Sequence, residues 1–263
     1  MMKYLIRRVL NFAFRGRWVR IRSIFSKTVI DRIGDHKLEY FLNTDVGNQL
    51  YYHGGFEKNE MALCARYLNE NSNIIDIGSN IGIHSIFFAK TSTNGVVLAI
   101  EPQAAIYDVL LYNIGHYKNV VPLNIAIDSS LKICEFFVAS DNAYSSLKNT
   151  ERKAIIDKNL VVTIPFDRIS DLFEHIDFVK IDVEGFEYEA LKSMENMLRS
   201  HKPTLFVEIY AGSNSNNKPD ETVAYLTNMG YSAYVVSDKG SLDKYIKHND
   251  RFYNYFFLWE GKK

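Results

Sequence analysis

The sequence of 263 residues is poor in proline, glycine and cysteine, with 5, 14 and 2 residues respectively. So few prolines and glycines exclude collagen-like chains and most low-complexity chains. Neither Cys64 nor Cys134 belongs to a CxxC pair, and apolar residues surround both. Two buried thiols in a reducing compartment are therefore expected, which favours a cytoplasmic location.

Long apolar runs are absent as well. The longest uninterrupted runs have about five residues, such as 96–100 and 255–259, whereas a transmembrane helix needs about 20. The sequence therefore predicts no membrane span. Its 47% hydrophobic and 24% charged residues are ordinary for a globular chain, and the chain is long enough to fold without a disulfide or a metal ion.

The net charge is zero, but the charges are unevenly distributed. Residues 1–30 contain eight basic and no acidic residues, which leaves 23 basic and 31 acidic residues in the remainder. An amphipathic helix is expected over residues 5–13, before Gly16. Two interpretations stay open: peripheral contact with the anionic inner face of a membrane or with an acidic partner, and a helix packed on the domain. No nucleic-acid motif accompanies the arginines, so nucleic acid is not an expected partner.

Two regions follow from this pattern: an N-terminal extension over residues 1–56, with the basic helix and short strands, and a main domain over 57–263. Short strands are expected within 17–30 and 37–42, and a loop over 45–60 that leads into a helix.

Strand and helix patterns alternate along the main domain, which indicates a mostly parallel α/β sheet with helices on both faces. The polar region 128–165 is expected to hold a strand and a hairpin or helical insertion, and the last two strands could form an antiparallel edge hairpin. Strands are predicted over 73–78, 95–102, 120–127, 176–185, 204–210, 231–237 and 254–260, and helices over 61–68, 80–90, 103–114, 186–199 and 220–229.

A turn with glycines, DIGSNIG, follows the first of these strands. Glycines at such a turn let the backbone approach a ligand closely, and Gly78 and Gly82 are the expected positions. The dinucleotide pattern GxGxxG fails, because Asn80 and Ile83 stand where its second and third glycines should be. Asp76 in the same loop disfavours a pyrophosphate, so the loop favours a cationic or zwitterionic ligand.

Glu101 ends the second strand, 25 residues after Asp76. An acid at this point of a βαβ unit can accept both hydrogens of a ribose diol, although each acid alone is also an ordinary strand-end residue. A ligand with a ribose, a positive centre and no pyrophosphate fits the description of S-adenosylmethionine. The expected cofactor-binding residues are Glu57, Asp76, Gly78, Ser79, Asn80, Gly82, Glu101, Asn124 and Asp128.

Four segments carry a family resemblance: NIIDIGSNIGIHSIFFAK, VVLAIEP, FVKIDVEGFEYEALK and PTLFVEIY, in this order. Over residues 45–260 the chain resembles the FkbM-type family of S-adenosylmethionine-dependent methyltransferases. The resemblance implies the class I methyltransferase fold, a Rossmann-like, seven-stranded, mostly parallel sheet with helices on both faces and an antiparallel last strand. It also implies O-methylation, often of sugars or other polyhydroxylated metabolites.

The acids after the fourth strand are the candidate catalytic residues. Asp182 and Glu184 follow that strand, Glu208 ends its neighbour, and alternation places Lys180 on the same side as Asp182. A hydroxyl is a poor nucleophile until a base or a metal ion helps it to lose its proton. The carboxylates could therefore be a base with its orienting partner, or a site for Mg²⁺. The alternative is that Glu184 only caps the next helix, and that Lys180 only neutralises buried acids.

Other polar residues are weaker candidates. His84 in the helix after the glycine turn is expected to be a packed residue more than a base, and His53 precedes the first helix of the main domain. Tyr144 or Tyr210 could line a sugar-binding cleft. Rival functions are methylation of a polyketide or lipid hydroxyl, and a non-catalytic domain that keeps the fold.

Overall fold

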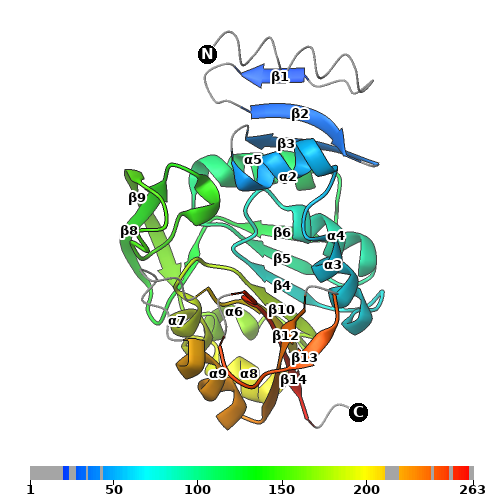
Figure 1. Cartoon of the computed structure of the whole chain (residues 1–263), viewed down its shortest axis with the longest axis vertical. Coiled ribbons are helices and arrows are strands. Elements are labelled where there is room, and N and C mark those ends of the chain that lie inside the picture. The colour runs from blue at the N-terminus through cyan, green and yellow to red at the C-terminus, as the bar shows by residue number, and fades with distance from the viewer. Residues whose placement is uncertain are drawn as a thin grey trace. The chain divides into compact units, whose positions relative to one another are not determined.

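The computed structural model divides the chain into two compact units, Met1–Phe56 and Glu57–Lys263 (Figure 1). The helix expected over residues 5–13, and with it the expected membrane or partner contact, lies outside the described residues. None of the helices in the described ranges combines the length and the apolarity that a membrane crossing requires. The structure describes residues 20–23, 28–33, 35–41, 44–210, 219–237, 240–248 and 251–260.

The first unit contains a three-stranded antiparallel sheet and a helix, α2 (Asp45–His53). The loop expected over 45–60 is therefore wrong for most of its length. Helix α2 begins where the Thr44 hydroxyl accepts the Gly47 N–H, and it ends at Gly54 in a left-handed conformation. These two caps favour a helix more strongly than the polar composition favours a loop. The strands are β1 (Arg20–Ser23), β2 (Thr28–Ile33) and β3 (His36–Phe41), paired in that order.

The second unit is built on a large sheet, and the predicted α/β fold is confirmed. Its strands β4, β5, β6, β10 and β11 run parallel, and β14 is antiparallel to both of its neighbours, β11 and β12. Within the described residues this sheet has eight strands, in the order β13-β12-β14-β11-β10-β4-β5-β6, so short β13 adds an edge to the seven expected. The strands are β4 (Ile74–Ile77), β5 (Val97–Ile100), β6 (Val120–Leu123), β10 (Phe178–Ile181), β11 (Thr204–Glu208), β12 (Tyr231–Val236), β13 (Leu242–Lys244) and β14 (Asn254–Trp259).

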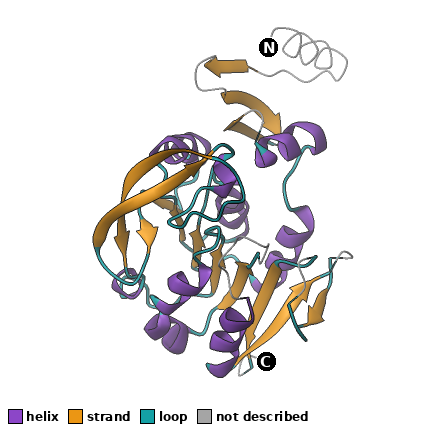
Figure 2. Cartoon of the chain, turned by 60° about the vertical axis from the view of Figure 1, so that its left-hand side comes forward, coloured by secondary structure: helices purple, strands orange, loops and turns teal. Residues whose placement is uncertain are grey.

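Helices cover both faces of this sheet (Figures 1 and 2). On one face, Ile75 and Ile77 belong to the core that includes Leu191, Leu198 and Leu226 of the later helices. The opposite face packs on the earlier helices, where Phe88 contacts Phe178 with ring centroids 5.6 Å apart. The helices are α3 (Lys58–Cys64) with the 3₁₀ turn Ala65–Tyr67, α4 (Ile83–Thr91), α5 (Ala104–Ile114), α6 (Asp167–Ser170), α7 (Glu187–Lys192), α8 (Glu195–His201) and α9 (Pro219–Asn228).

A small second sheet branches from the large one. It has the order β7-β9-β8, formed by β7 (Ala126–Ile127), β8 (Lys132–Ala139) and β9 (Ile155–Ile164), with a 3₁₀ turn at Asn142–Tyr144. The antiparallel pair β8–β9 is the hairpin expected in the polar region. The single strand predicted over 120–127 is wrong, because the chain leaves the large sheet at Asn124 and continues as β7 beside β9.

Three further differences concern element limits. Helix α4 begins at Ile83 and not at residue 80, since Asn80 and Gly82 have positive φ and form the turn. The helix predicted over 186–199 is interrupted at Ser193 and becomes α7 and α8. The last two predicted strands pair antiparallel, but β14 lies inside the sheet, between β11 and β12, and does not form an edge hairpin.

Gly78, just after β4, lies close to the chain that follows the neighbouring strand β10. Its φ is 78°, and a Cβ at this position would lie 1.8 Å from the backbone oxygen of Asp182, just after β10. A real Cβ cannot approach a backbone atom so closely. The glycine is therefore required by the approach of β10, in addition to any role at a ligand.

We expect Gly78→Ala to destabilise the fold more than Gly240→Ala. Both glycines have positive φ, but a Cβ at Gly240 would make only ordinary contact, 3.5 Å from the Asn59 Cβ. The left-handed conformation should cost Gly240→Ala about 1–2 kcal/mol, and overpacking should add about 1–3 kcal/mol at Gly78. Urea denaturation measures both losses, and equal losses would contradict the proposed steric role.

Candidate active site

A pocket lies at the C-terminal ends of the parallel strands, where an open α/β sheet binds its ligands. It has a volume of about 610 Å³, including its solvent-open mouth. Gly78 and Asn80 from the turn after β4, Glu101 after β5, and Asp182 after β10 all line it. The structure thus brings four of the predicted site residues to one pocket.

Glu101 is the buried acid of this pocket, with 7% of its surface exposed. Its Oε2 accepts the N–H of Asn80 at 3.0 Å, and its Oε1 accepts the N–H of Gln103 at 2.8 Å. Burial raises the pKa of Glu101 to about 7, although the two N–H groups act in the opposite direction. The carboxylate is therefore rigidly held, and its remaining lone pairs are open to a ligand in the pocket.

Other residues of the glycine turn support the pocket without lining it. The Ser79 hydroxyl donates to the backbone oxygen of Asp76 at 2.8 Å. Gly82 lies against α5, where a Cβ would meet Leu110 Cδ1 at 2.6 Å. The close approach expected at Gly82 is therefore an approach between helices, whereas Gly78 both lines the pocket and contacts β10.

Asp76 is fully buried on β4 and does not line the pocket. Its Oδ2 accepts the Ser85 hydroxyl of α4 at 2.6 Å, and its Oδ1 lies 3.9 Å from Lys180 Nζ. The cation beside Asp76 is thus a lysine of the same domain. The contribution of Asp76 to a cationic ligand stays a prediction based on sequence.

Asn124 and Asp128 also act within the protein. The Asn124 amide donates to the backbone oxygens of Glu101 and Pro102 at 2.8 and 3.0 Å, so it fixes the end of β5. Asp128 accepts the Ser129 N–H and lies 2.7 Å from Lys132 Nζ. Neither lines the pocket, and their contact with a cofactor stays a prediction based on sequence.

Glu57 and His84 form a largely buried pair, and Glu57 is close enough to Lys180 and Glu208 to interact with both electrostatically. Oε2 of Glu57 lies 3.2 Å from Nε2 of His84. Burial raises the pKa of Glu57, but His84 and Lys180 outweigh burial and hold it below its ordinary value. His84 packs near the rings of Phe88 and Phe206, as expected for a packed helical histidine. His53 lies at the end of α2, in the other unit.

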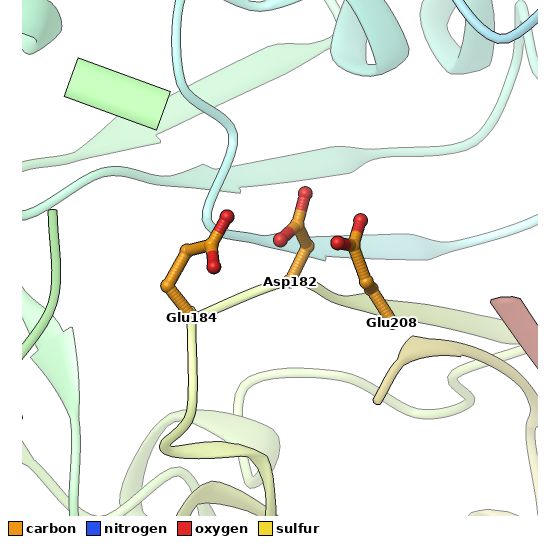
Figure 3. Close-up of side chains that lie close together, drawn as sticks. All are labelled: Asp182, Glu184 and Glu208. Atoms are coloured by element: carbon orange, nitrogen blue, oxygen red, sulfur yellow. The ribbon is translucent and has the colours of Figure 1, made fainter. Parts of the chain in front are cut away.

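Three carboxylates meet at the ends of β10 and β11. Asp182, Glu184 and Glu208 each offer an oxygen, and these oxygens all lie within 4.8 Å of one another. Figure 3 shows the three side chains extending in the same direction from the strand ends. A cluster of this kind could accept a proton, bind hydroxyl groups or supply ligands to a divalent cation.

Lys180 is the buried cation beneath the cluster. Its Nζ donates to Asp182 Oδ2 at 3.1 Å and lies 3.9 Å from Asp76. Burial lowers the pKa of Lys180, but the two carboxylates outweigh burial and raise it above its ordinary value. Lys180 therefore stays charged and neutralises buried acids, as the strand alternation suggested.

The surroundings of Glu184 and Glu208 disfavour the ionised form of their carboxyl groups. Burial and the neighbouring Asp182 raise the pKa of both carboxyl groups well above the ordinary value. Arg152 counters the shift at Glu184, to which its guanidinium donates. Among the described residues, Glu208 has no such hydrogen-bonded cation. The cluster therefore disfavours the simultaneous ionisation of all three carboxyl groups.

Arg152 is the site residue that sequence reasoning missed. Besides its ion pair with Glu184, its guanidinium carbon lies 4.5 Å from the ring centroid of Tyr144 and 4.0 Å from that of Tyr210. The two tyrosines suggested for a sugar cleft thus lie beside the carboxylates. Arg152 belongs to no periodic pattern, and it is 32 residues from Glu184 in sequence. The available signal in the sequence was a basic side chain within the polar region 128–165.

Comparisons with known proteins identify the family of this chain. The model of the methyltransferase FkbM domain matches residues 76–233. The hexuronic acid methyltransferase AglP of Haloferax volcanii is 31% identical over 59% of this chain and 63% of its own length. The methyltransferase sdnD of Sordaria araneosa is 26% identical over 60% of this chain and 73% of its own length.

A solved structure shares the fold. The methyltransferase FkbM from Methylobacillus flagellatus KT superposes with a TM-score of 0.53 at 17% identity, over 79% of this chain and 50% of that chain. The match thus spans less than two thirds of the Haloferax protein and half of the Methylobacillus chain. Since the family model covers more than half of this chain, the chain belongs to the FkbM methyltransferase family.

Proposed function

We propose that this chain transfers a methyl group from S-adenosylmethionine to a hydroxyl group of a sugar or glycan precursor. The observation that carries the proposal is the cluster of Asp182, Glu184 and Glu208 beside the pocket that Glu101 lines. Family membership supports methyl transfer. The name of the Haloferax relative, a hexuronic acid methyltransferase, supports a sugar acceptor.

The pocket fits the methyl donor. Both oxygens of Glu101 are fixed by backbone N–H groups, so their remaining lone pairs suit the two hydroxyls of a ribose. Ile106, Ile125 and Phe136 give the same pocket apolar walls that suit a flat adenine ring. When bound, S-adenosylmethionine supplies a methyl group on a positively charged sulfur, which the nearby carboxylates favour.

Asp182 is the candidate base, because its carboxylate lines the pocket. Lys180 donates to Oδ2 and fixes the group, which leaves Oδ1 to accept the proton of the acceptor hydroxyl as that oxygen attacks. Glu184 and Glu208 lie within 4.8 Å and would orient the acceptor by hydrogen bonds to its hydroxyls. Alignment and proton acceptance are the two requirements of such an in-line displacement.

A divalent cation such as Mg²⁺ is the second candidate for acidifying the hydroxyl. The three carboxylates would be its ligands. However, Lys180 already pairs with Asp182, and Arg152 with Glu184, so the charges favour direct proton acceptance. Turnover that survives EDTA supports the base, whereas loss that Mg²⁺ restores supports the metal.

The acceptor is tested by transfer of labelled methyl groups to nucleotide-sugars and glycans, with polyketide and lipid hydroxyls as the competing classes. Transfer to the sugars supports the proposal, and transfer only to a lipid or polyketide overturns its acceptor. No transfer to any hydroxyl would favour a non-catalytic domain. Peripheral membrane contact through residues 1–30 stays a prediction based on sequence.

We expect Asp182→Asn to lower turnover by about 10²–10⁴-fold, the usual effect of losing a general base. Affinity for S-adenosylhomocysteine should stay within a few-fold of the parent, because the substitution keeps the shape of the side chain. Glu174→Gln is a matched control, since Glu174 is an exposed acid before β10, at the opposite end of the strand. Parental turnover in Asp182→Asn would place the base elsewhere, with Glu184 and Glu208 next.

We expect the affinity for S-adenosylhomocysteine to rise between pH 6 and pH 8. The ionised form of Glu101 accepts the ribose hydrogens, and its pKa is about 7, so acidification should weaken binding by up to about tenfold over this range. Calorimetry at several pH values measures the effect. Glu101→Gln should bind more weakly and lose the pH dependence, and an unchanged profile in that variant would remove Glu101 from the ribose site.

A further inference from the structure

The segment between β8 and β9, residues 140–154, lies against the loop that carries the catalytic acids. The Ser146 hydroxyl donates to the backbone oxygen of Val183 at 2.9 Å. Asn142, Ser145 and Leu147 of the same segment line the pocket together with Asp182. One connection of the small sheet thus touches both the pocket and the chain next to Glu184.

Arg152 makes the polar contact between this segment and the acid cluster. Its guanidinium pairs with Glu184, and the two side chains are only 18% and 10% exposed. Burial at both partners strengthens an ion pair and reduces its screening by salt. Loss of Arg152 would therefore leave a largely buried carboxyl group without its cation.

Two tyrosines hold the guanidinium in place. The rings of Tyr144, from the segment itself, and Tyr210, after β11, lie 4.5 and 4.0 Å from the guanidinium carbon. A planar guanidinium stacks on aromatic rings while its N–H groups point outward in the plane, which a lysine cannot reproduce. The two rings and the Glu184 carboxylate thus fix the position of the Arg152 guanidinium.

Glu184 needs such support. It is a non-glycine residue at φ 52°, and its flexible side chain lies near two other carboxylates that repel it. Asp182 disfavours the ionised form of Glu184, and Arg152 favours it. Arg152 offsets this repulsion at the point where an acceptor would lie.

We propose that Arg152 is a positioning residue of the acceptor site: with Tyr144 and Tyr210 it holds the Glu184 carboxylate in place to accept hydrogen bonds from a sugar hydroxyl. The inference rests on the proposed function. It assigns Tyr144, Arg152 and Tyr210 to the acceptor site and leaves cofactor binding to Glu101 and the glycine turn.

Full-length Arg152→Met and Arg152→Lys test the inference, with Lys153→Met as the matched control. Lys153 also lies over Tyr144, at 4.8 Å, and no contact with the acid cluster involves it in the described structure. We expect Arg152→Met to lower kcat/KM for the acceptor by about 100-fold, the scale of a misplaced group. The kcat/KM of Arg152→Lys should lie between those of Arg152→Met and the parent, and that of Lys153→Met should equal the parent's. All should bind S-adenosylhomocysteine as the parent does.

A double variant separates positioning from general stability. If Arg152 acts through Glu184, Arg152→Met in a Glu184→Gln background should cause no further loss of kcat/KM. Millimolar guanidinium should partly restore Arg152→Ala and leave Glu184→Gln unchanged. Additive losses, no rescue, or equal losses in Lys153→Met would overturn the inference.

Hydrogen exchange of the cofactor-free protein tests the same contact without turnover. Arg152→Met should speed exchange within residues 140–154 and 183–186 while β4 stays protected, and Lys153→Met should not. If the parent transfers no methyl group to any acceptor, the proposed function fails, and this measurement still decides whether Arg152 holds the loop. Unchanged exchange in Arg152→Met would overturn the positioning role.

Discussion

The arrangement of side chains at the strand ends depends on the ion pairs of the buried Lys180 with Asp76 and Asp182. Lys180 and Asp76 are direct partners in the register of β10 and β4, and Asp182 follows Lys180 by two residues, one repeat of the strand. Removing one partner of a buried ion pair lowers the stability of the fold by roughly 3–5 kcal/mol. Loss of any one of Lys180, Asp76 and Asp182 should therefore destabilise the other two. The ion pair fixes the two central strands and places Asp182 at the pocket, and Glu184 and Glu208 then take their positions around it.

Much of the fold could be predicted from sequence because buried parallel strands are short runs of apolar residues, such as Ile74–Ile77. The expected fold class and the antiparallel last strand are confirmed. Element limits were less predictable. The helix Asp45–His53 depends on its caps at Thr44 and Gly54, which a prediction based on polar composition overlooks. Strands β6 and β7 are separate because they pair with different strands, β5 and β9.

The candidate site could be predicted where chain order implies proximity. Residues after neighbouring parallel strands share one edge of the sheet, so Glu101, Asp182 and Glu208 follow from topology alone. What each group touches does not. Asp76 faces inward to Ser85 and Lys180, Gly82 serves helix packing, and Arg152 reaches Glu184 from a hairpin connection. Side-chain direction and long-range pairing are properties of the packed structure, and no local pattern encodes them.

The position of β14 has a consequence for biosynthesis. Glu208, at the end of β11, pairs in register with Asn254 of β14, a strand that the ribosome makes 46 residues later. Until then β11 has one open edge, and its apolar residues Phe206 and Val207 lack the rings of Phe256 and Tyr255 beside them. A nascent chain can therefore form β4, β5 and β10 early, while the wall of the site at Glu208 closes only in the final step of folding. A half-made chain would expose that edge to chaperones or to other chains.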